Sequence, residues 1–512
     1  MDLDPRAVQI AAAALWLKAK LLAPEARPER LNLVAANLRL SSLPDTDAAV
    51  IELRREVERE TGMPGALTDT LVHALRGADH LGSLLRVDAA VEAALTAHEQ
   101  AAGTLGRPVA EQGGLFTGFN AERKRVRIGR DTARATLLDS LDGFLAKHTH
   151  GDDLGLRLRG EQLAAGVRFV RIVREGTYDV VVANPPYQGT AKMADTKYVK
   201  QAYPLGKADL YAAFLLRGLE LVKPGGVSAM LTMRNWMFIK QYAGLRQHLL
   251  GTYGLRALHD LSSGAFEEIS AAQVVVSVVS SVFARGVPIS DALALKVFDD
   301  ATVTQVGETL RKRAATLCHE GRRTFDPAAL EVVPEWPLVY WWDAAFLERY
   351  SNAAKLKSAM QSRVGVRTSN NGRFVRRAWE PSFKSVLLTH FGQPLPSMFE
   401  VNFVPHVMGG AGRAWLEDVA DVINWRSNGL EVCVTLERAY GAYPQAVGYY
   451  FAPLVALPKI GTNFRARSPR FRSIFDCASP SVFPSDLAPV LALLNASATR
   501  DFVQCLNPTV NL

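Results

Sequence analysis

The fold is decided by residues 178–187, which read Tyr-Asp-Val-Val-Val-Ala-Asn-Pro-Pro-Tyr. The unbroken run of valines predicts a strand that is covered on both faces, as in a parallel sheet. The two prolines that follow cannot donate to a sheet ladder, so the strand is expected to end before them. Because open α/β sheets bind their ligands at the carboxyl ends of strands, we expect Asn184 and the residues after it to line a site.

The residues at this tip suit methyl transfer to an amine. The exocyclic amine of a nucleobase is a weak nucleophile, because its lone pair is delocalised into the ring. The side-chain oxygen of Asn184 and the carbonyl oxygen of Pro185 can accept hydrogen bonds from both N–H groups and free the lone pair for attack on a methyl sulfonium. The ring of Tyr187 offers a face on which a flipped base can stack. The predicted catalytic residues are Asn184, Pro185, Pro186 and Tyr187.

The Asn-Pro-Pro-Tyr string at residues 184–187 resembles motif IV of amino-methyltransferases that use S-adenosylmethionine. Asn at the first position is similar to the branch that methylates adenine at N6. Methyltransferases that modify the side-chain amide of glutamine share the string, so it indicates the reaction better than the substrate. The plainer alternative is a strand that happens to stop at a Pro-Pro turn.

Composition sets wide bounds on the class of protein. With 512 residues, 48% of them apolar and 21% charged, the chain is typical of a folded protein with several domains. The net charge of +8 is compatible with nucleic-acid binding without being diagnostic of it. The four cysteines are far apart and show no metal-ligand spacing, which favours a reducing, cytoplasmic compartment and no metal. No apolar run reaches the length of a membrane span.

The first residues predict the end of a strand followed by a helix. Asp4 is a good N-cap and Pro5 suits the first helical position, and we interpret the Ala-rich run that follows as a core helix. The acidic-hydrophobic-Asp-Pro string at residues 2–5 resembles the second cofactor motif of methyltransferases. That resemblance implies that Asp2 holds the ribose hydroxyls of S-adenosylmethionine. The predicted cofactor-binding residues are Asp2, Asp4, Asn37 and Asp209.

Methyltransferases of this kind carry a Gly-rich cofactor loop ahead of the second motif, and here no such loop precedes residues 2–5. The resemblance therefore implies either a piece of a longer enzyme or a companion chain that supplies the loop.

Two further stretches resemble parts of the reacting centre. The Asp-Leu-Tyr string at residues 209–211 resembles a motif near the pocket floor, although a helix cap and a core aromatic would explain it equally well. Phe266 follows Gly264-Ala265 at the place where adenine methyltransferases carry a ring that sandwiches the flipped base, and a buried core Phe is the alternative. The predicted residues for the substrate base are Phe266 and Tyr211.

Beyond about residue 300 short strands and polar turns replace the alternation of helix and strand. Arginines, amides and aromatics are interleaved in residues 363–374 and 459–472, a mixture that suits contacts to the backbone and base edges of DNA. A solvated basic surface is the alternative. The predicted DNA-binding residues are Arg367, Arg373, Lys459, Arg465 and Arg467.

In their order along the chain, these strings resemble the adenine-specific DNA methyltransferases of BREX phage-defence systems. The resemblance also rests on Thr232-Met233-Arg234-Asn235-Trp236 and on the Thr-Ser-Asn-Asn-Gly-Arg-Phe string at residues 368–374. It implies S-adenosylmethionine as donor, double-stranded DNA as substrate and other phage-defence proteins as partners. Two alternatives stay open, which are a non-catalytic DNA-binding fragment or subunit without the cofactor loop and a protein-glutamine methyltransferase.

We therefore predict an α/β chain with a Rossmann-like methyltransferase sheet, a helical insertion and a C-terminal α+β DNA-recognition domain. The expected boundaries are 1–45 for the first part of the methyltransferase domain, 46–175 for the insertion, 176–300 for the core with the Asn-Pro-Pro-Tyr string, and 301–512 for the target-recognition region.

Overall fold

The structure is a computed structural model. It describes residues 4–25, 33–35, 77–90, 169–262, 277–296, 308–397, 401–409, 414–441, 443–459 and 464–506, together with isolated residues and short pieces such as 2, 27, 106–108, 125–127 and 265–266. Most of the predicted insertion lies outside the described residues. Asn37, which precedes the insertion, lies outside them too.

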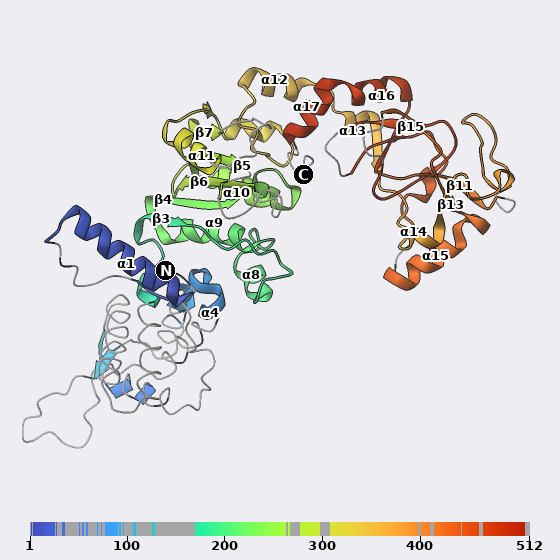
Figure 1. Cartoon of the computed structure of the whole chain (residues 1–512). Helices are drawn as coiled ribbons and strands as arrows, with labels where there is room; N and C mark the ends of the chain where they lie inside the picture. The colour runs from blue at the N-terminus through green and yellow to red at the C-terminus, as the bar shows by residue number, and fades with distance from the viewer. Residues whose placement is uncertain are drawn as a thin grey trace, which may run out of the picture.

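A mixed six-stranded sheet forms the centre of the first body, in the order β3-β4-β6-β5-β7-β8. The strands are β3 (Tyr178–Ala183), β4 (Val222–Met233), β5 (Gly254–Ser262), β6 (Val278–Ala284), β7 (Ala292–Lys296) and β8 (Arg322–Phe325). Strands β3 and β4 are parallel, and β6 runs antiparallel between β4 and β5. This arrangement confirms the predicted α/β class and places the carboxyl ends of β3 and β4 at one edge (Figure 1).

The connection between β3 and β4 follows from local sequence. Helix α9 (Leu210–Leu221) begins after Asp209, whose side chain accepts a hydrogen bond from the backbone of Tyr211. The first residues of β4 include two glycines, Gly225 and Gly226. A Cβ at Gly226 would lie 2.9 Å from the carbonyl oxygen of Tyr178, so only glycine permits this close approach of the two strands.

The prediction that β3 is covered on both faces is wrong. Strand β3 stands at the end of the strand order, and Val180 and Val182 are 58% and 76% exposed. Val181 and Ala183 point to the other face and pack against the core. The valine run therefore predicted the strand correctly but not its surroundings, because periodicity cannot distinguish an uncovered apolar face from a covered one.

Helix α1 (Pro5–Leu22) also differs from its prediction. Its start is as expected, since the side chain of Asp4 accepts a hydrogen bond from the backbone N–H of Arg6 and Pro5 occupies the first turn. It is not a core helix, however, because none of its residues is buried and Ile10 and Leu21 are largely exposed. Leu17 is exposed as well.

The first core extends past the boundary predicted at residue 300. Strand β8 belongs to the sheet, and Leu330, Leu338 and Leu347 are buried in the same cluster as the residues of α9. Helix α12 (Ala344–Asn352) closes this part of the chain. Phe502 of the C-terminal helix α17 (Ser497–Leu506, red in Figure 1) returns to pack against this cluster.

A second body, orange in Figure 1, contains two small sheets. One has the order β10-β13-β11-β16 and the other β12-β15-β14-β17-β9. The strands are β9 (Met360–Arg363), β10 (Val375–Arg377), β11 (Phe403–Val407), β12 (Trp415–Glu417), β13 (Asp421–Asn424), β14 (Val455–Ala456), β15 (Arg467–Pro469), β16 (Ile474–Phe475) and β17 (Ser481–Pro484). Helix α15 (Arg426–Tyr440) packs Val432 and Leu436 into the core of this body.

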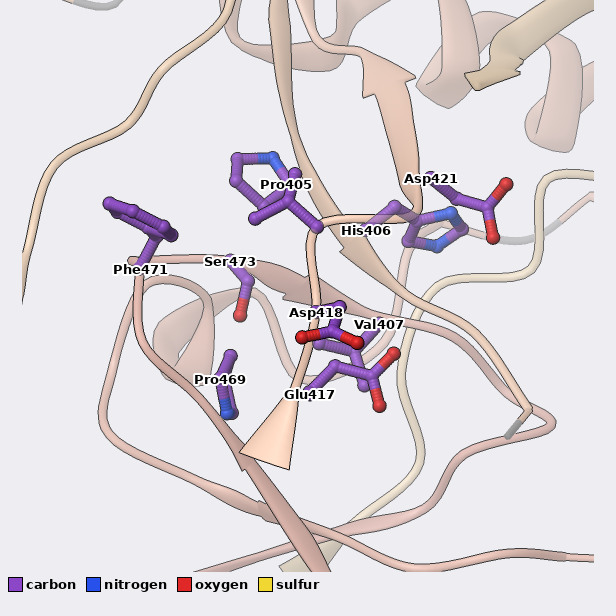
Figure 2. A pocket seen from close by; sticks show the side chains of 10 residues that line it. Pro405, His406, Val407, Glu417, Asp418, Asp421, Pro469, Phe471 and Ser473 are labelled. Carbon is purple, nitrogen blue, oxygen red and sulfur yellow. The ribbon is translucent and has the colours of Figure 1, made fainter. Parts of the chain in front are cut away.

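His406 on β11 is a buried histidine in the second body. Neither ring nitrogen has a hydrogen-bond partner within the described part of the chain, and the histidine borders a hollow of about 10 Å³, which holds about one water. Figure 2 shows the ring beside Asp421, with the carboxylates of Glu417 and Asp418 below it. Burial lowers the pKa of His406 to about 4, against the opposing charges of Asp476 and Asp421.

The low pKa of His406 predicts a loss of stability in acid. The unfolded chain takes up this proton near pH 6.5 and the folded chain only near pH 4, so the free energy of unfolding falls as the pH drops between these values. Between pH 7 and pH 5 the expected loss is about 2 kcal/mol from this residue alone. Urea unfolding of the wild type and of His406→Leu at both pH values measures it. Equal losses in the two proteins would contradict the assignment to His406.

Candidate active site

A pocket of about 750 Å³ opens at the carboxyl end of β3. This volume suits a small organic ligand. Six of the predicted site residues line it, namely Asp2, Asn184, Pro185, Pro186, Tyr187 and Phe266. Segments far apart in the sequence thus converge on one cavity.

Asn184 is the first residue after β3, and its side chain is exposed in the pocket rather than packed in the core. The hydroxyl of Tyr187 lies 3.3 Å from Asn184 Oδ1 and 3.3 Å from the carbonyl oxygen of Leu231 on β4. A hydroxyl has one proton, so it can donate to only one of these acceptors at a time. When the proton is directed to Asn184 Oδ1, Tyr187 fixes the carboxamide, and an oxygen with two lone pairs can still accept a second hydrogen bond from a ligand.

The ring of Tyr187 is half-buried and stands edge-on to Tyr211, with 6.1 Å between the ring centroids and an interplanar angle of 90°. Burial raises the pKa of Tyr187 to about 12, so the hydroxyl stays protonated at neutral pH. Tyr211 itself is fully buried behind Tyr187 and packs against Tyr242. The prediction that Tyr211 contacts the base is therefore wrong in this structure, because the core aromatic of the alternative interpretation is what the chain contains.

Asp209 does not line the pocket. Its carboxylate accepts hydrogen bonds from the backbone N–H groups of Gln188, at 3.0 Å, and Tyr211, at 3.3 Å. Burial raises the pKa of Asp209, although these hydrogen bonds oppose the shift. Asp209 thus caps α9 and ties it to the chain just after Tyr187, which is the helix cap of the alternative interpretation, and it lies outside the pocket that Asp2 lines.

The two N-terminal carboxylates, Asp2 and Asp4, differ in their contacts. Asp2 forms a parallel bridge with Ala35, accepts a hydrogen bond from the backbone N–H of Asp4 at 2.9 Å, and lines the pocket. Asp4 caps α1, pairs with Arg6 at 2.8 Å, and does not line the pocket. The hydrogen bonds from Arg6 hold the pKa of Asp4 below its usual value.

Sequence reasoning missed one wall of the pocket. Residues 80–84, in helix α4 (Ala78–Leu81) and the 3-10 turn η2 (Gly82–Leu84), face the Asn-Pro-Pro-Tyr tip across the cavity. This segment lies inside the region predicted to be an insertion. A sequence signal for a segment packed against α9 is Arg217, a charged residue in the apolar run of that helix, because a buried charge needs partners.

Arg217 joins this wall to the sheet. It is fully buried and donates to the carbonyl oxygens of Ser83 at 2.7 Å and Leu85 at 3.0 Å. It also pairs with Glu175 and, at 2.9 Å, with Glu220. A buried guanidinium that satisfies backbone and carboxylate groups together fixes the turn over the end of the sheet.

The predicted DNA-binding residues are not equivalent. Arg467 is fully buried and paired with Glu417, so the prediction that it contacts DNA is wrong. Its guanidinium also donates to the carbonyl oxygen of Met408 at 2.5 Å and to Ser479 Oγ at 3.0 Å, so its hydrogen bonds are made inside the second body. The other four predicted residues are exposed, namely Arg367, Arg373, Lys459 and Arg465. The guanidinium of Arg367 stacks on the ring of Tyr440 at 4.7 Å.

No set of three or more His, Cys, Asp and Glu side chains in the described part of the chain is arranged to hold a metal ion. None of its helices combines the length and the apolar character that crossing a membrane requires.

Comparison with known proteins gives curated relatives of this chain. A curated adenine-specific methyltransferase, PglX of Lacticaseibacillus casei (strain Zhang), is 28% identical over 347 residues, which cover 65% of this chain and 28% of that protein. BrxX of Escherichia coli O9:H4 (strain HS), also an adenine-specific methyltransferase, is 28% identical over 260 residues, which cover 50% of this chain and 20% of that protein. The chain thus spans less than a third of the length of these relatives.

Among solved structures, the Type IIL restriction-modification enzyme MmeI in complex with DNA aligns with 96% of this chain and 63% of its own, at 10% identity and a TM-score of 0.41. The family model described as Eco57I restriction-modification methylase matches residues 1–266, which is more than half of the sequence. That match includes Asp2, Asn184 and Phe266, the residues that converge on the pocket. The chain belongs to the Eco57I restriction-modification methylase family.

Proposed function

We propose that this chain acts as a site-specific, adenine-specific DNA methyltransferase in a phage-defence or restriction-modification system, with S-adenosylmethionine as donor and double-stranded DNA as substrate. The observation that carries the proposal is the single pocket that brings Asp2 together with Asn184, Tyr187 and Phe266. The adenine-specific relatives PglX and BrxX support the same reaction.

The residues of the pocket fit the proposed donor. The carboxylate of Asp2 is an acceptor for ribose hydroxyls, and Leu81 and Phe214 offer apolar surface to an adenine ring. When bound, S-adenosylmethionine supplies an electrophilic methyl group. No metal ligand is needed for such a transfer.

The chain's own groups then act on the base. Asn184 Oδ1 accepts a hydrogen bond from the exocyclic amine, and the Pro185 carbonyl oxygen accepts a second one, so that the lone pair of the nitrogen becomes available. Tyr187 and Phe266 line the same cavity and provide ring surface for the flipped base. Arg367, Arg373, Lys459 and Arg465 remain the proposed contacts to DNA outside the pocket.

A companion polypeptide is proposed at β3. In the described part of the chain, this strand pairs with β4 alone, and Val180 and Val182 are exposed on one of its faces. A parallel strand that pairs with the free edge and is followed by a Gly-rich loop would reach the pocket, because Val182 and Ala183 already line it. Other defence proteins would join the same assembly.

The test is transfer of labelled methyl from S-adenosylmethionine to mixed-sequence duplex DNA, with the chain alone and with its genomic neighbours co-expressed. N6-methyladenine in the digested DNA, detected by mass spectrometry, is the expected result. Label on glutamine of a protein, with none in DNA, would contradict it in favour of a protein methyltransferase. DNA binding without any calorimetric heat for S-adenosylmethionine in either preparation would contradict it in favour of a non-catalytic subunit.

A further inference from the structure

Two large aromatic side chains stand out from the surface of the second body. Trp379 is 77% exposed in the turn after β10, and Phe383 is 78% exposed at the start of the 3-10 turn η6 (Phe383–Ser385). Aromatic rings carry much of the energy of cores and interfaces, so leaving two of them in water forgoes that stabilisation. A binding partner that covers these two rings would recover that stabilisation.

The backbone that carries the rings is anchored. The N–H of Glu380 donates to the carbonyl of Arg377 at 3.0 Å and closes the turn around Trp379. The N–H of Ala378 donates to the carbonyl of Ala420 at 3.0 Å, which ties this turn to the residue before β13. The next turn closes through the N–H of Val386 on the carbonyl of Phe383, at 3.2 Å. The rings are thus displayed from fixed turns and not from frayed ends.

Cations flank the rings. Lys384 is exposed next to Phe383, and Arg376 and Arg377 precede Trp379. Arg377 pairs with Asp421 at 2.9 Å and Arg376 with Glu380 at 3.9 Å, but both arginine side chains are about half exposed. Exposed pairs contribute little, so a phosphate can compete for these guanidinium groups.

An open hollow of about 540 Å³ lies on the same segment. It is lined by Arg376, Arg377 and Glu380, together with Asn371 and Asp421. Cationic groups that contact phosphates, beside apolar rings that insert at base steps, form the combination by which proteins hold and distort duplex DNA. A protein partner would favour a continuous apolar patch, whereas here the two rings are bordered by Arg376, Arg377 and Lys384.

We propose that this aromatic-basic patch (Trp379, Phe383, Arg376, Arg377 and Lys384) binds duplex DNA, with the two rings packed against its bases and sugars and the three cations on its phosphates. The inference rests on the proposed function and adds to it a contact surface outside the pocket. Its rings act by stacking or wedging at the groove, as apolar side chains do when they distort a duplex.

The experiment titrates fluorescein-labelled mixed-sequence duplex DNA with the full chain and follows anisotropy. Trp379→Ala is expected to weaken binding about tenfold and Phe383→Ala about fivefold, because each loses the contact of an aromatic ring with the DNA, while Trp379→Phe stays within about threefold of the wild type. Trp16→Ala is the matched control, because Trp16 is an exposed tryptophan on α1, and it should bind normally.

Salt dependence separates the two kinds of contact. The plot of log K against log salt has a negative slope. Arg377→Gln is expected to reduce the steepness of this slope by about 1, and Trp379→Ala to leave it unchanged. The tryptophan emission that is lost in Trp379→Phe should be quenched by DNA in the wild type.

The inference and the proposed function can fail separately. If Trp379→Ala binds DNA within twofold of the wild type, the patch is overturned and the function stands. If the ring variants change only the self-association of the chain, as measured by light scattering, the DNA assignment is likewise overturned. If the wild type binds no DNA at low salt, both the patch and the proposed function fall.

Discussion

Replacing Asn184 by alanine is expected to lower the rate of methyl transfer by about 10²–10³-fold, the usual cost of losing one positioned polar group at a reacting centre. The reason is geometric. Asn184 is exposed in the pocket at the end of β3, and its Oδ1 lies 3.3 Å from the Tyr187 hydroxyl, which can donate a hydrogen bond to it. Alanine removes the acceptor and leaves the strand, the prolines and the pocket as they are.

The measurement compares single-turnover methyl transfer with binding of S-adenosylmethionine, both in the preparation that is active for the wild type. Binding should stay within about threefold, because the residue acts on the amine and not on the donor. Gln188→Ala is the matched control, since Gln188 is an exposed neighbour that bonds Asp209 through its backbone N–H alone. Wild-type rates in Asn184→Ala would remove the chemical basis of the proposed function.

Replacing Arg217 by methionine is expected to lower the free energy of unfolding by about 3–5 kcal/mol, the cost of leaving the partners of a buried ion pair uncompensated. Glu175 would lose its buried partner, and Glu220 would keep only its pair with the partly exposed Arg86. The carbonyl oxygens of Ser83 and Leu85 would lose their donors at 2.7 Å and 3.0 Å. Since the 82–84 turn lines the pocket, binding of S-adenosylmethionine should weaken together with stability.

Urea unfolding and calorimetric titration measure the two effects on Arg217→Met. Arg217→Lys is expected to recover little, because a single ammonium cannot reach two carboxylates and two carbonyls together. The control is Arg6→Ala, in which an exposed pair with Asp4 is removed and the change should stay below about 0.5 kcal/mol. A loss below about 1 kcal/mol for Arg217→Met would mean that the turn is held by other contacts.

Local signals in the sequence were enough for several elements. The valine run and the two prolines predicted strand β3 and its end, and Asp4 with Pro5 predicted the start of α1. Asn184 and Tyr187 were predicted to share a site, and both line the same pocket. In each case the interacting groups are a few residues apart, so propensity, capping and the missing N–H of proline act within the segment itself.

The corrections concern contacts between distant residues. Arg465 and Arg467 look alike in the sequence, yet one is exposed and the other is fully buried and paired with Glu417. Asp209 resembles a cofactor ligand, but its partner is the backbone of Gln188. Tyr211 resembles a base contact and lies in the core. Burial and hydrogen-bond partners such as these are set by packing, and no pattern within a short segment contains them.

The amino-acid sequence by itself determined the α/β class and the strand that ends just before Asn184, because these depend on residue type and on neighbours along the chain. Only the tertiary structure decided that residues 80–84 face the tip, through the bonds of Arg217 to a turn about 130 positions earlier. It also decided that β3 carries an exposed apolar face. The physical reason is that burial of a side chain is a property of the packed chain as a whole.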